Sequence, residues 1–243
     1  MWGYMSTVCE VAFSAPRAAE MKEGITDSLR YWQDLPELET LDLYTPASAA
    51  DADPYVDEGA APAYLTLLAF PSLPALHRAA HHPGFRSALE GLGDAILTCT
   101  AMRRSEHTVA GADAPTPLHA PFSYVVRYHR PAEDEALFIQ HYLETHPPLL
   151  GRLPRIRNVL CYVPLLWQNR AGMPAAEYML GNEVVFDHSE DFRAAMASPL
   201  RHELRAHFRQ FPPFSGRNTH YPMNRRRLFP EVTPPCARAA SAP

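Results

Sequence analysis

The chain has 243 residues, of which 47% are hydrophobic and 20% charged, and its formal net charge is −5. This composition is typical of a globular domain with a sizeable core, and the mild negative charge argues against a nucleic-acid partner, which calls for a dense basic surface. The four cysteines are widely scattered, without any short Cys/His spacing. The sequence therefore indicates neither a zinc site nor a disulfide framework.

Two features argue against a membrane or exported protein. The longest uncharged stretch, residues 59–76, is interrupted by three prolines and makes a poor membrane span. The first residues lack the charged and apolar regions of a signal peptide. We therefore expect no membrane partner and a cytoplasmic location.

The first half of the chain predicts the order strand, helix, strand, strand, helix, strand. Apolar runs and alternating patterns predict the strands, and 3.6-residue periodicity predicts the helices. Ser72 is the expected N-cap of the second helix. The strands are expected at 7–13, 38–44, 63–70 and 96–103, and the helices at 16–32 and 73–92.

The second half predicts the same order. Strands are expected at 122–128, 159–166, 178–186 and 214–221, and helices at 132–152 and 189–208, the last capped by Ser189. Residues 106–120 are polar and proline-rich, as in a linker. Residues 230–243 are rich in alanine and proline, which predicts a disordered tail.

Two blocks of sequence recur in the same order. Residues 35–38 read LPEL and residues 153–156 read LPRI, an offset of 118. Residues 78–80 and 193–195 both read RAA, an offset of 115. Repeated blocks at nearly one spacing predict a tandem duplication.

The predicted fold class is α+β, with two ferredoxin-like βαββαβ repeats packed as an intrachain α+β barrel. Each unit forms a four-stranded antiparallel sheet with helices on one face, and the bare apolar faces of the two units cover each other. The first repeat is expected over 1–105, a linker over 106–120 and the second repeat over 121–229. Whether whole chains also pair as a homodimer stays open.

The most distinctive motif is FIQHYLETHPPLL at residues 138–150, followed by LPRIR at 153–157. Pro147 and Pro148 disfavour a regular helix, so we expect His146 at a helix break with its imidazole directed off the helix surface. Tyr142 lies one turn earlier. An imidazole exchanges protons near neutral pH, and a neighbouring phenol can orient it or bind a substrate oxygen. The alternative is a purely structural His-Pro, in which the imidazole caps a freed carbonyl.

Two further residues are candidates for catalysis. His141 lies five residues before His146, about 140° away around an ideal helix, so we expect the two to have different roles. Glu183 sits among apolar residues in the strand at 178–186 and can point into the barrel. A buried carboxylate with a raised pKa can act as a general base. The alternative is a solvent-facing strand position.

Other patterns are weaker. His77 and His81 have the helical spacing of a metal pair but lack the glutamate of the HExxH zinc motif, so an exposed helix face is the simpler interpretation. Residues 225–227, all arginine, suit either an anionic group or a solvated chain end. The sequence lacks a glycine-rich phosphate loop and a nucleophile elbow, which disfavours nucleotide and serine-hydrolase chemistry.

The motif resembles the EthD family of the dimeric α+β barrel superfamily, whose pattern is roughly F-x2-H-Y/F-x3-H-x-P-L and then L-P-G-L/I-R. Arg155 replaces the usual glycine. The resemblance implies a small apolar pocket between sheet and helices, and a link to the catabolism of aromatics, ethers or lactones. The first half lacks the motif, which implies a degenerate first repeat and one site per chain. The matching residues are Phe138, His141, Tyr142, His146, Pro148, Leu149, Leu153, Pro154, Ile156 and Arg157.

The resulting hypothesis is a cofactor-independent enzyme that acts on a small, apolar, oxygenated intermediate derived from an aromatic or a lactone. His146 is the expected general acid/base and Tyr142 its helper, in an isomerase, cyclase or lyase reaction. We expect no cofactor and no metal. The alternatives are a non-catalytic binding protein for a hydrophobic small molecule and a haem-binding barrel with an inward-facing histidine.

Overall fold

The computed structural model describes residues 5–13, 29–47, 61–92, 96–112, 116–167, 169 and 172–230. Most of the helix predicted at 16–32 lies outside these residues, although residues 29–33 are helical. The tail beyond residue 230 lies outside them too. In the described part the strands are β1 Met5–Phe13, β2 Thr40–Pro46, β3 Tyr64–Phe70, β4 Ile96–His107, β5 Phe122–His129, β6 Asn158–Pro164, β7 Tyr178–Phe186 and β8 Asn218–Phe229.

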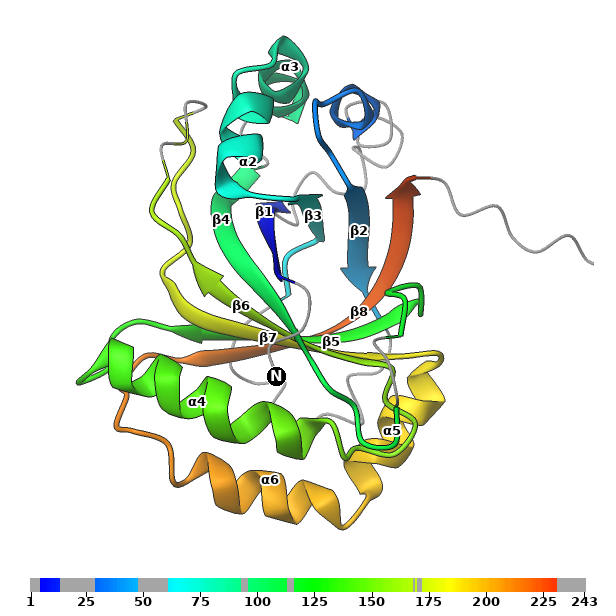
Figure 1. The fold of residues 1–243 in the computed structure, drawn as a ribbon, viewed down its shortest axis with the longest axis vertical. Helices are drawn as coiled ribbons and strands as arrows, with labels where there is room; N and C mark the ends of the chain where they lie inside the picture. The colour runs from blue at the N-terminus through cyan, green and yellow to red at the C-terminus, as the bar shows by residue number, and fades with distance from the viewer. Residues whose placement is uncertain are drawn as a thin grey trace, which may run out of the picture.

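These strands close into an antiparallel barrel in the order β1-β3-β2-β8-β5-β7-β6-β4 (Figure 1). The strands of the first half follow one another as β4-β1-β3-β2, and those of the second half as β8-β5-β7-β6. Pairing of β2 with β8 and of β4 with β6 joins the halves. The predicted α+β class with a closed barrel is therefore confirmed.

Helices cover the outside of the barrel. Those described in full are α2 Leu73–Ala80, α3 Pro83–Leu92, α4 Glu135–Leu150, α5 Ser189–Ala197 and α6 Leu200–Phe208. The first two lie over the first half, and α4 to α6 lie beneath the second half (Figure 1). Because side chains alternate along a strand, each strand contributes one face to a helix-covered core and the other to the barrel interior.

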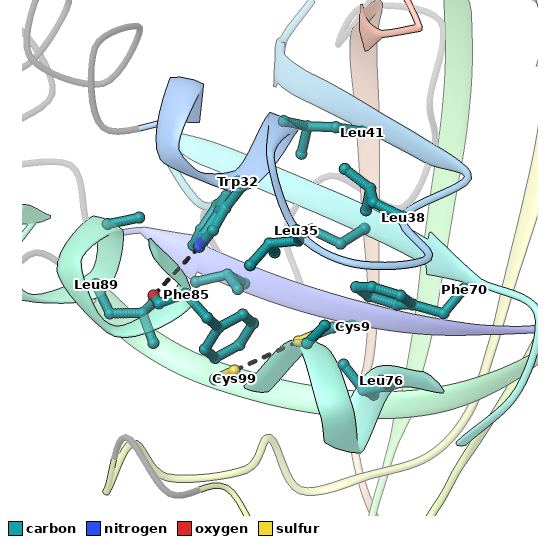
Figure 2. Packing of buried hydrophobic residues seen from close by; sticks show 14 of the residues in the cluster. Cys9, Trp32, Leu35, Leu38, Leu41, Phe70, Leu76, Phe85, Leu89 and Cys99 are labelled. Carbon is teal, nitrogen blue, oxygen red and sulfur yellow. Dashed lines mark hydrogen bonds between the residues drawn. The ribbon is translucent and has the colours of Figure 1, made fainter. Parts of the chain in front are cut away.

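The outer core of the first half is apolar. Figure 2 shows Trp32 and Phe85 packed above the strands, and the Trp32 indole donates to the Phe85 carbonyl at 3.3 Å. The sulfurs of Cys9 and Cys99, on neighbouring strands, lie 3.5 Å apart. Ser72 caps α2 through a bond from the Ala75 amide, as predicted.

Two long predicted helices are each divided by a proline. The helix expected at 73–92 becomes α2 and α3, with Pro83 as the first residue of α3. The helix expected at 189–208 becomes α5 and α6, because Ser198, just before Pro199, is extended. Ser189 is the first residue of α5 rather than its N-cap, which is His188, so that detail of the prediction is wrong.

The final strand also differs from its prediction. It runs from 218 to 229 instead of 214–221, because β8 pairs with β5 and then with β2. This places Arg225 and Arg227 against Asp42 of β2 inside a strand, with 2.6 Å between Arg227 Nε and Asp42 Oδ1. The arginine run is therefore not a solvated chain end. The strand β4 likewise continues to His107, into the segment expected to be a linker.

Glu37 and Arg155 have the same unusual backbone. Their φ angles are 59° and 61°, in the left-handed region that favours glycine, and they stand 118 residues apart, the offset of the sequence blocks. Each is ion-paired to a residue of a helix region, Glu37 to Arg78 at 2.6 Å and Arg155 to Asp191 at 2.8 Å. Arg155 thus has a backbone conformation that favours glycine, the residue usual at this position of the EthD pattern.

Candidate active site

A cavity of about 240 Å³ lies between the outer face of the second-half sheet and helices α4 to α6. The sheet contributes Tyr124, Tyr128, Asn182 and His220, and the helices contribute His146, Arg201 and Phe208, with aliphatic side chains between them. Resemblance to EthD proteins implied a pocket in this position. The walls are mostly apolar with a few polar groups, as is usual for small-molecule sites.

His146 reaches the cavity from a continuous helix. The expected helix break is wrong, because α4 continues through Pro147 and Pro148 to Leu150. Both prolines fall in the last turns, where Tyr142, His146, Pro147 and Leu150 are buried against the sheet. Packing of this face offsets the two missing amide donors.

The imidazole of His146 is almost fully buried, at 7% exposure. Its Nδ1 lies 3.0 Å from Nδ1 of His207 on α6, a hydrogen bond that leaves Nε2 for a ligand. Burial, and then the neighbouring His207 and His141, lower the pKa of His146 to about 3. His146 is therefore a neutral imidazole at neutral pH.

His207 contacts both His141 and His146, which lie about 140° apart around an ideal helix. The His141 ring stacks on His207 with centroids 6.0 Å apart, and the His146 ring lies 5.2 Å from His207. The expectation that His141 and His146 have different roles stays a prediction, although His207 contacts both rings. The tautomer of His146 sets the role of Nε2: when Nδ1 of His146 donates to His207, Nε2 is an acceptor, and when Nδ1 accepts from His207, Nε2 of the neutral ring carries the proton and donates.

Tyr142 lies behind His146 rather than in the cavity wall. It is fully buried, and its ring centroid is 4.9 Å from that of His146. Its hydroxyl accepts a hydrogen bond from the Asn182 amide, which does line the cavity. Burial raises the pKa of Tyr142 well above its usual value, so the phenol stays protonated. Tyr142 therefore orients Asn182 instead of meeting a ligand.

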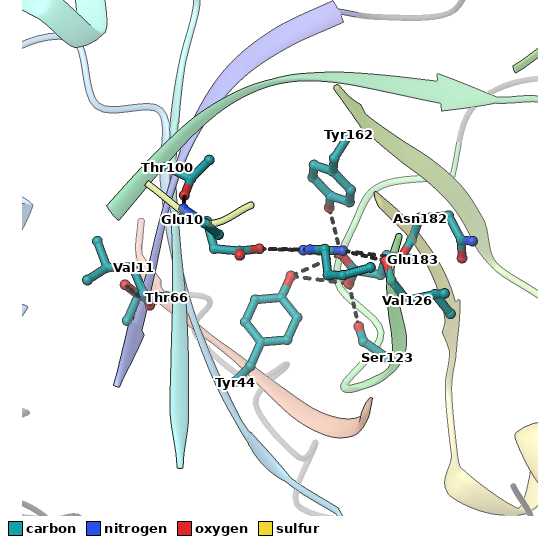
Figure 3. Close-up of polar contacts among 12 residues, drawn as sticks. Glu10, Val11, Tyr44, Thr66, Thr100, Ser123, Val126, Tyr162, Asn182 and Glu183 are labelled. Carbon is teal, nitrogen blue, oxygen red and sulfur yellow. Dashed lines mark hydrogen bonds and ion pairs between the residues drawn. The ribbon is translucent and has the colours of Figure 1, made fainter. Parts of the chain in front are cut away.

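Glu183 is buried and faces the barrel interior, as its apolar neighbours suggested, so it lies on the opposite side of the sheet from the cavity. Asn182 and Val184, on either side of it in β7, face the cavity. Figure 3 shows the carboxylate surrounded by Tyr44, Ser123 and Tyr162. It accepts hydrogen bonds from Ser123 at 2.5 Å and Tyr162 at 2.6 Å. The structure thus does not bring Glu183 together with His146.

Sequence reasoning missed three residues of this region: Asn182, His207 and Arg201. Asn182 carried a weak signal, since it and Glu183 are polar side chains in a mainly apolar strand. His207 and Arg201 belong to a polar helix, whose pattern does not show which polar residues face inward.

The described residues contain no group of three His, Cys, Asp or Glu side chains placed to hold a metal ion. Within the same residues, every helix is too short or too polar to cross a membrane.

Residues 130–212 match the model of the EthD domain, which confirms the resemblance drawn from the histidine motif. The residues that match the EthD domain lie in the second half of the closed antiparallel barrel. No curated protein matches the sequence.

Several solved structures share the fold over nearly the whole chain. An anthrone oxidase-like protein is 12% identical with a TM-score of 0.56, and the match covers 94% of each chain. A protein of Fusobacterium nucleatum assigned as a monooxygenase is 9% identical, with a TM-score of 0.52 and coverage of 93% of this chain and 95% of its own. A similar protein of Lactobacillus acidophilus is 10% identical, with a TM-score of 0.50 and coverage of 91% and 94%. At these identities the likeness extends to the fold alone.

Proposed function

We propose that this protein is a cofactor-independent enzyme that moves a proton on a small, apolar, oxygenated substrate held in the cavity. The observation that carries the proposal is His146, a neutral imidazole with one nitrogen bound to His207 and the other available in an apolar cavity. Isomerisation, cyclisation and elimination next to a carbonyl all begin with such a proton transfer.

The chemistry follows from two polar groups of the wall, His146 and Asn182. His146 Nε2 takes a proton from the carbon next to a carbonyl, and the electrons move to the carbonyl oxygen as an enolate. Asn182 offers its second amide hydrogen to that oxygen. An imidazole with so low a pKa is a weak base in the empty cavity, but the enolate charge formed beside it raises the pKa of His146 during the reaction.

Roles for the other predicted residues follow from their positions. Tyr142 orients Asn182, and His141 packs against His207. Glu183 is assigned a structural role in the barrel interior. We also propose that the halves are tandem ferredoxin-like repeats, over 1–105 and 121–229. Their matching strand order and the left-handed Glu37 and Arg155 support this.

A non-catalytic binding protein is the second candidate, favoured by the same burial that weakens His146 as a base. Haem does not fit the cavity. A volume of about 240 Å³ lies below the roughly 300–1,000 Å³ of pockets for drug-sized ligands, and a porphyrin needs more.

Enolisation of 2-tetralone, an apolar bicyclic ketone, tests the proposal without knowledge of the natural substrate. Exchange of its α-hydrogens in D2O is followed by NMR with the wild type and with His146→Gln. We expect the wild type to accelerate exchange and His146→Gln to lose about 100-fold or more of that acceleration, the usual contribution of a general base.

The matched control is His202→Gln, since His202 is an exposed residue of α6 outside the cavity wall. This variant should accelerate exchange of the α-hydrogens of 2-tetralone as much as the wild type does. Wild-type protein that binds 2-tetralone without accelerating exchange would contradict catalysis and favour the binding protein.

A further inference from the structure

Two arginines stand on the face of α6 that lines the cavity. Arg201, Leu204, Arg205 and Phe208 recur at helical spacing and all contribute to the wall. The cavity is otherwise bounded mainly by aromatic and aliphatic side chains. One stretch of an apolar cavity is therefore positively charged.

Arg201 is the more informative of the two. Nearby arginines form ion pairs, such as Arg152 with Glu203 at 2.9 Å and Arg193 with Glu190 at 2.6 Å, yet in the described part of the chain Arg201 forms none. It is half-buried and lies in the first turn of α6, where the helix dipole disfavours a cation. Within the described residues, no carboxylate neutralises this charge.

The relative direction of the helices places Arg201 away from His146. His146 contacts His207, whereas Arg152, just beyond the end of α4, pairs with Glu203, so α4 and α6 run antiparallel. The rise from residue 201 to residue 207 is about 9 Å along the helix axis. A ligand that touches both ends must therefore carry its charge at one end and its reacting carbon near the other.

The walls and the volume define the body of that ligand. Tyr124, Tyr128 and Phe208 offer ring faces and edges. A cavity of about 150 Å³ holds benzene, so about 240 Å³ suits a substituted single ring or two fused rings.

We propose that the cavity binds a carboxylate-bearing aromatic compound of one or two rings, with Arg201 pairing the carboxylate and the ring system extending toward His146. This names the substrate class of the proposed function and rests on it. Arg205, one turn further along α6 and between Arg201 and His207, adds positive charge to the same wall.

Calorimetric titration with 2-naphthoate and with its neutral isostere 2-naphthamide tests this assignment. We expect the wild type to bind naphthoate about tenfold or more tightly than naphthamide, because charge-assisted hydrogen bonds are the stronger ones. Arg201→Gln should abolish that preference while leaving naphthamide affinity within about twofold. Arg209→Gln, an exposed arginine at the end of α6 outside the wall, should keep the preference.

Equal affinities of the wild type for the two probes, or a preference that survives Arg201→Gln, would overturn the assignment. So would a protein that accelerates tetralone exchange but does not bind naphthoate, and the proposed proton transfer would then stand. The two proposals can also fail separately in the other direction. If Arg201→Gln loses the preference for naphthoate but the wild type does not accelerate tetralone exchange, the carboxylate site is supported and the proton transfer is contradicted.

Discussion

At the scale of single residues, His146 combines burial with a histidine neighbour. Both effects disfavour the imidazolium, which is why its pKa falls to about 3. The sequence identified this residue and its partner Tyr142 through a local motif. It did not identify His207, because the contact joins residues 61 positions apart on two helices.

The lowered pKa predicts a dependence of stability on pH. Between about pH 6.5 and pH 3 the unfolded chain binds a proton at residue 146 that the folded protein does not bind. The free energy of unfolding therefore falls as the pH drops through this window, by up to about 1.4 kcal/mol per pH unit from this one residue. His146→Gln should flatten that slope in urea unfolding measured from neutral pH down to about pH 4.

His202→Gln is again the control, because His202 is exposed. Part of the acid sensitivity should survive in both variants, since burial also lowers the pKa of His220 and of His129 to about 4. Equal slopes for His146→Gln and the wild type would show that position 146 is not buried in neutral form.

At the scale of elements, prolines account for most differences between the expected and the observed helices. Pro83 and Pro199 divide helices that periodicity predicted as continuous, whereas Pro147 and Pro148 leave α4 intact. Each of these prolines lacks an amide hydrogen and crowds the preceding turn in the same way. The outcome differs because α4 has buried residues on both sides of its prolines, and this packing keeps the helix together.

Pro148 is the exposed member of the pair in α4. Pro148→Ala would restore an amide donor for the Glu144 carbonyl and remove the steric conflict there. We expect the free energy of unfolding to rise by about 1 kcal/mol, less than the roughly 3 kcal/mol cost of proline in a helix because the unfolded chain also gains freedom. Urea unfolding measures the change, and a loss of stability would show that the last turn depends on the proline ring.

At the scale of the whole molecule, the barrel interior ties the halves together by charge as well as by strand pairing. Glu10 of β1 and Arg127 of β5 form a fully buried ion pair. Arg127 also donates to the Val126 carbonyl at 3.0 Å and lies over the Tyr162 ring. Gly181 leaves room for it, because a Cβ there would come within 2.8 Å of the guanidinium.

Removal of one partner of this pair should strongly destabilise the folded protein. Arg127→Gln leaves Glu10 buried without its opposite charge, and we expect a loss of about 3–5 kcal/mol in the free energy of unfolding. Arg157→Gln, which breaks the exposed pair with Asp187, should cost less than about 1 kcal/mol.

The double variant Glu10→Gln/Arg127→Gln separates charge from packing. It should be more stable than Arg127→Gln alone, because the uncompensated carboxylate is gone. A double variant that loses the sum of the two single losses would contradict a direct interaction between the halves through this pair.

The sequence by itself determined the order of the strands, the α+β class, the repeat offset and the motif with His146 and Tyr142. These depend on periodicity and on neighbours within a few turns. Only the tertiary structure decided that β8 continues across the barrel to bury Arg225, that Glu183 and Asn182 face opposite sides of one sheet, and that His207 and Arg201 join the cavity. Those placements depend on which distant segments pack together, and the pattern of a single strand or helix does not contain that choice.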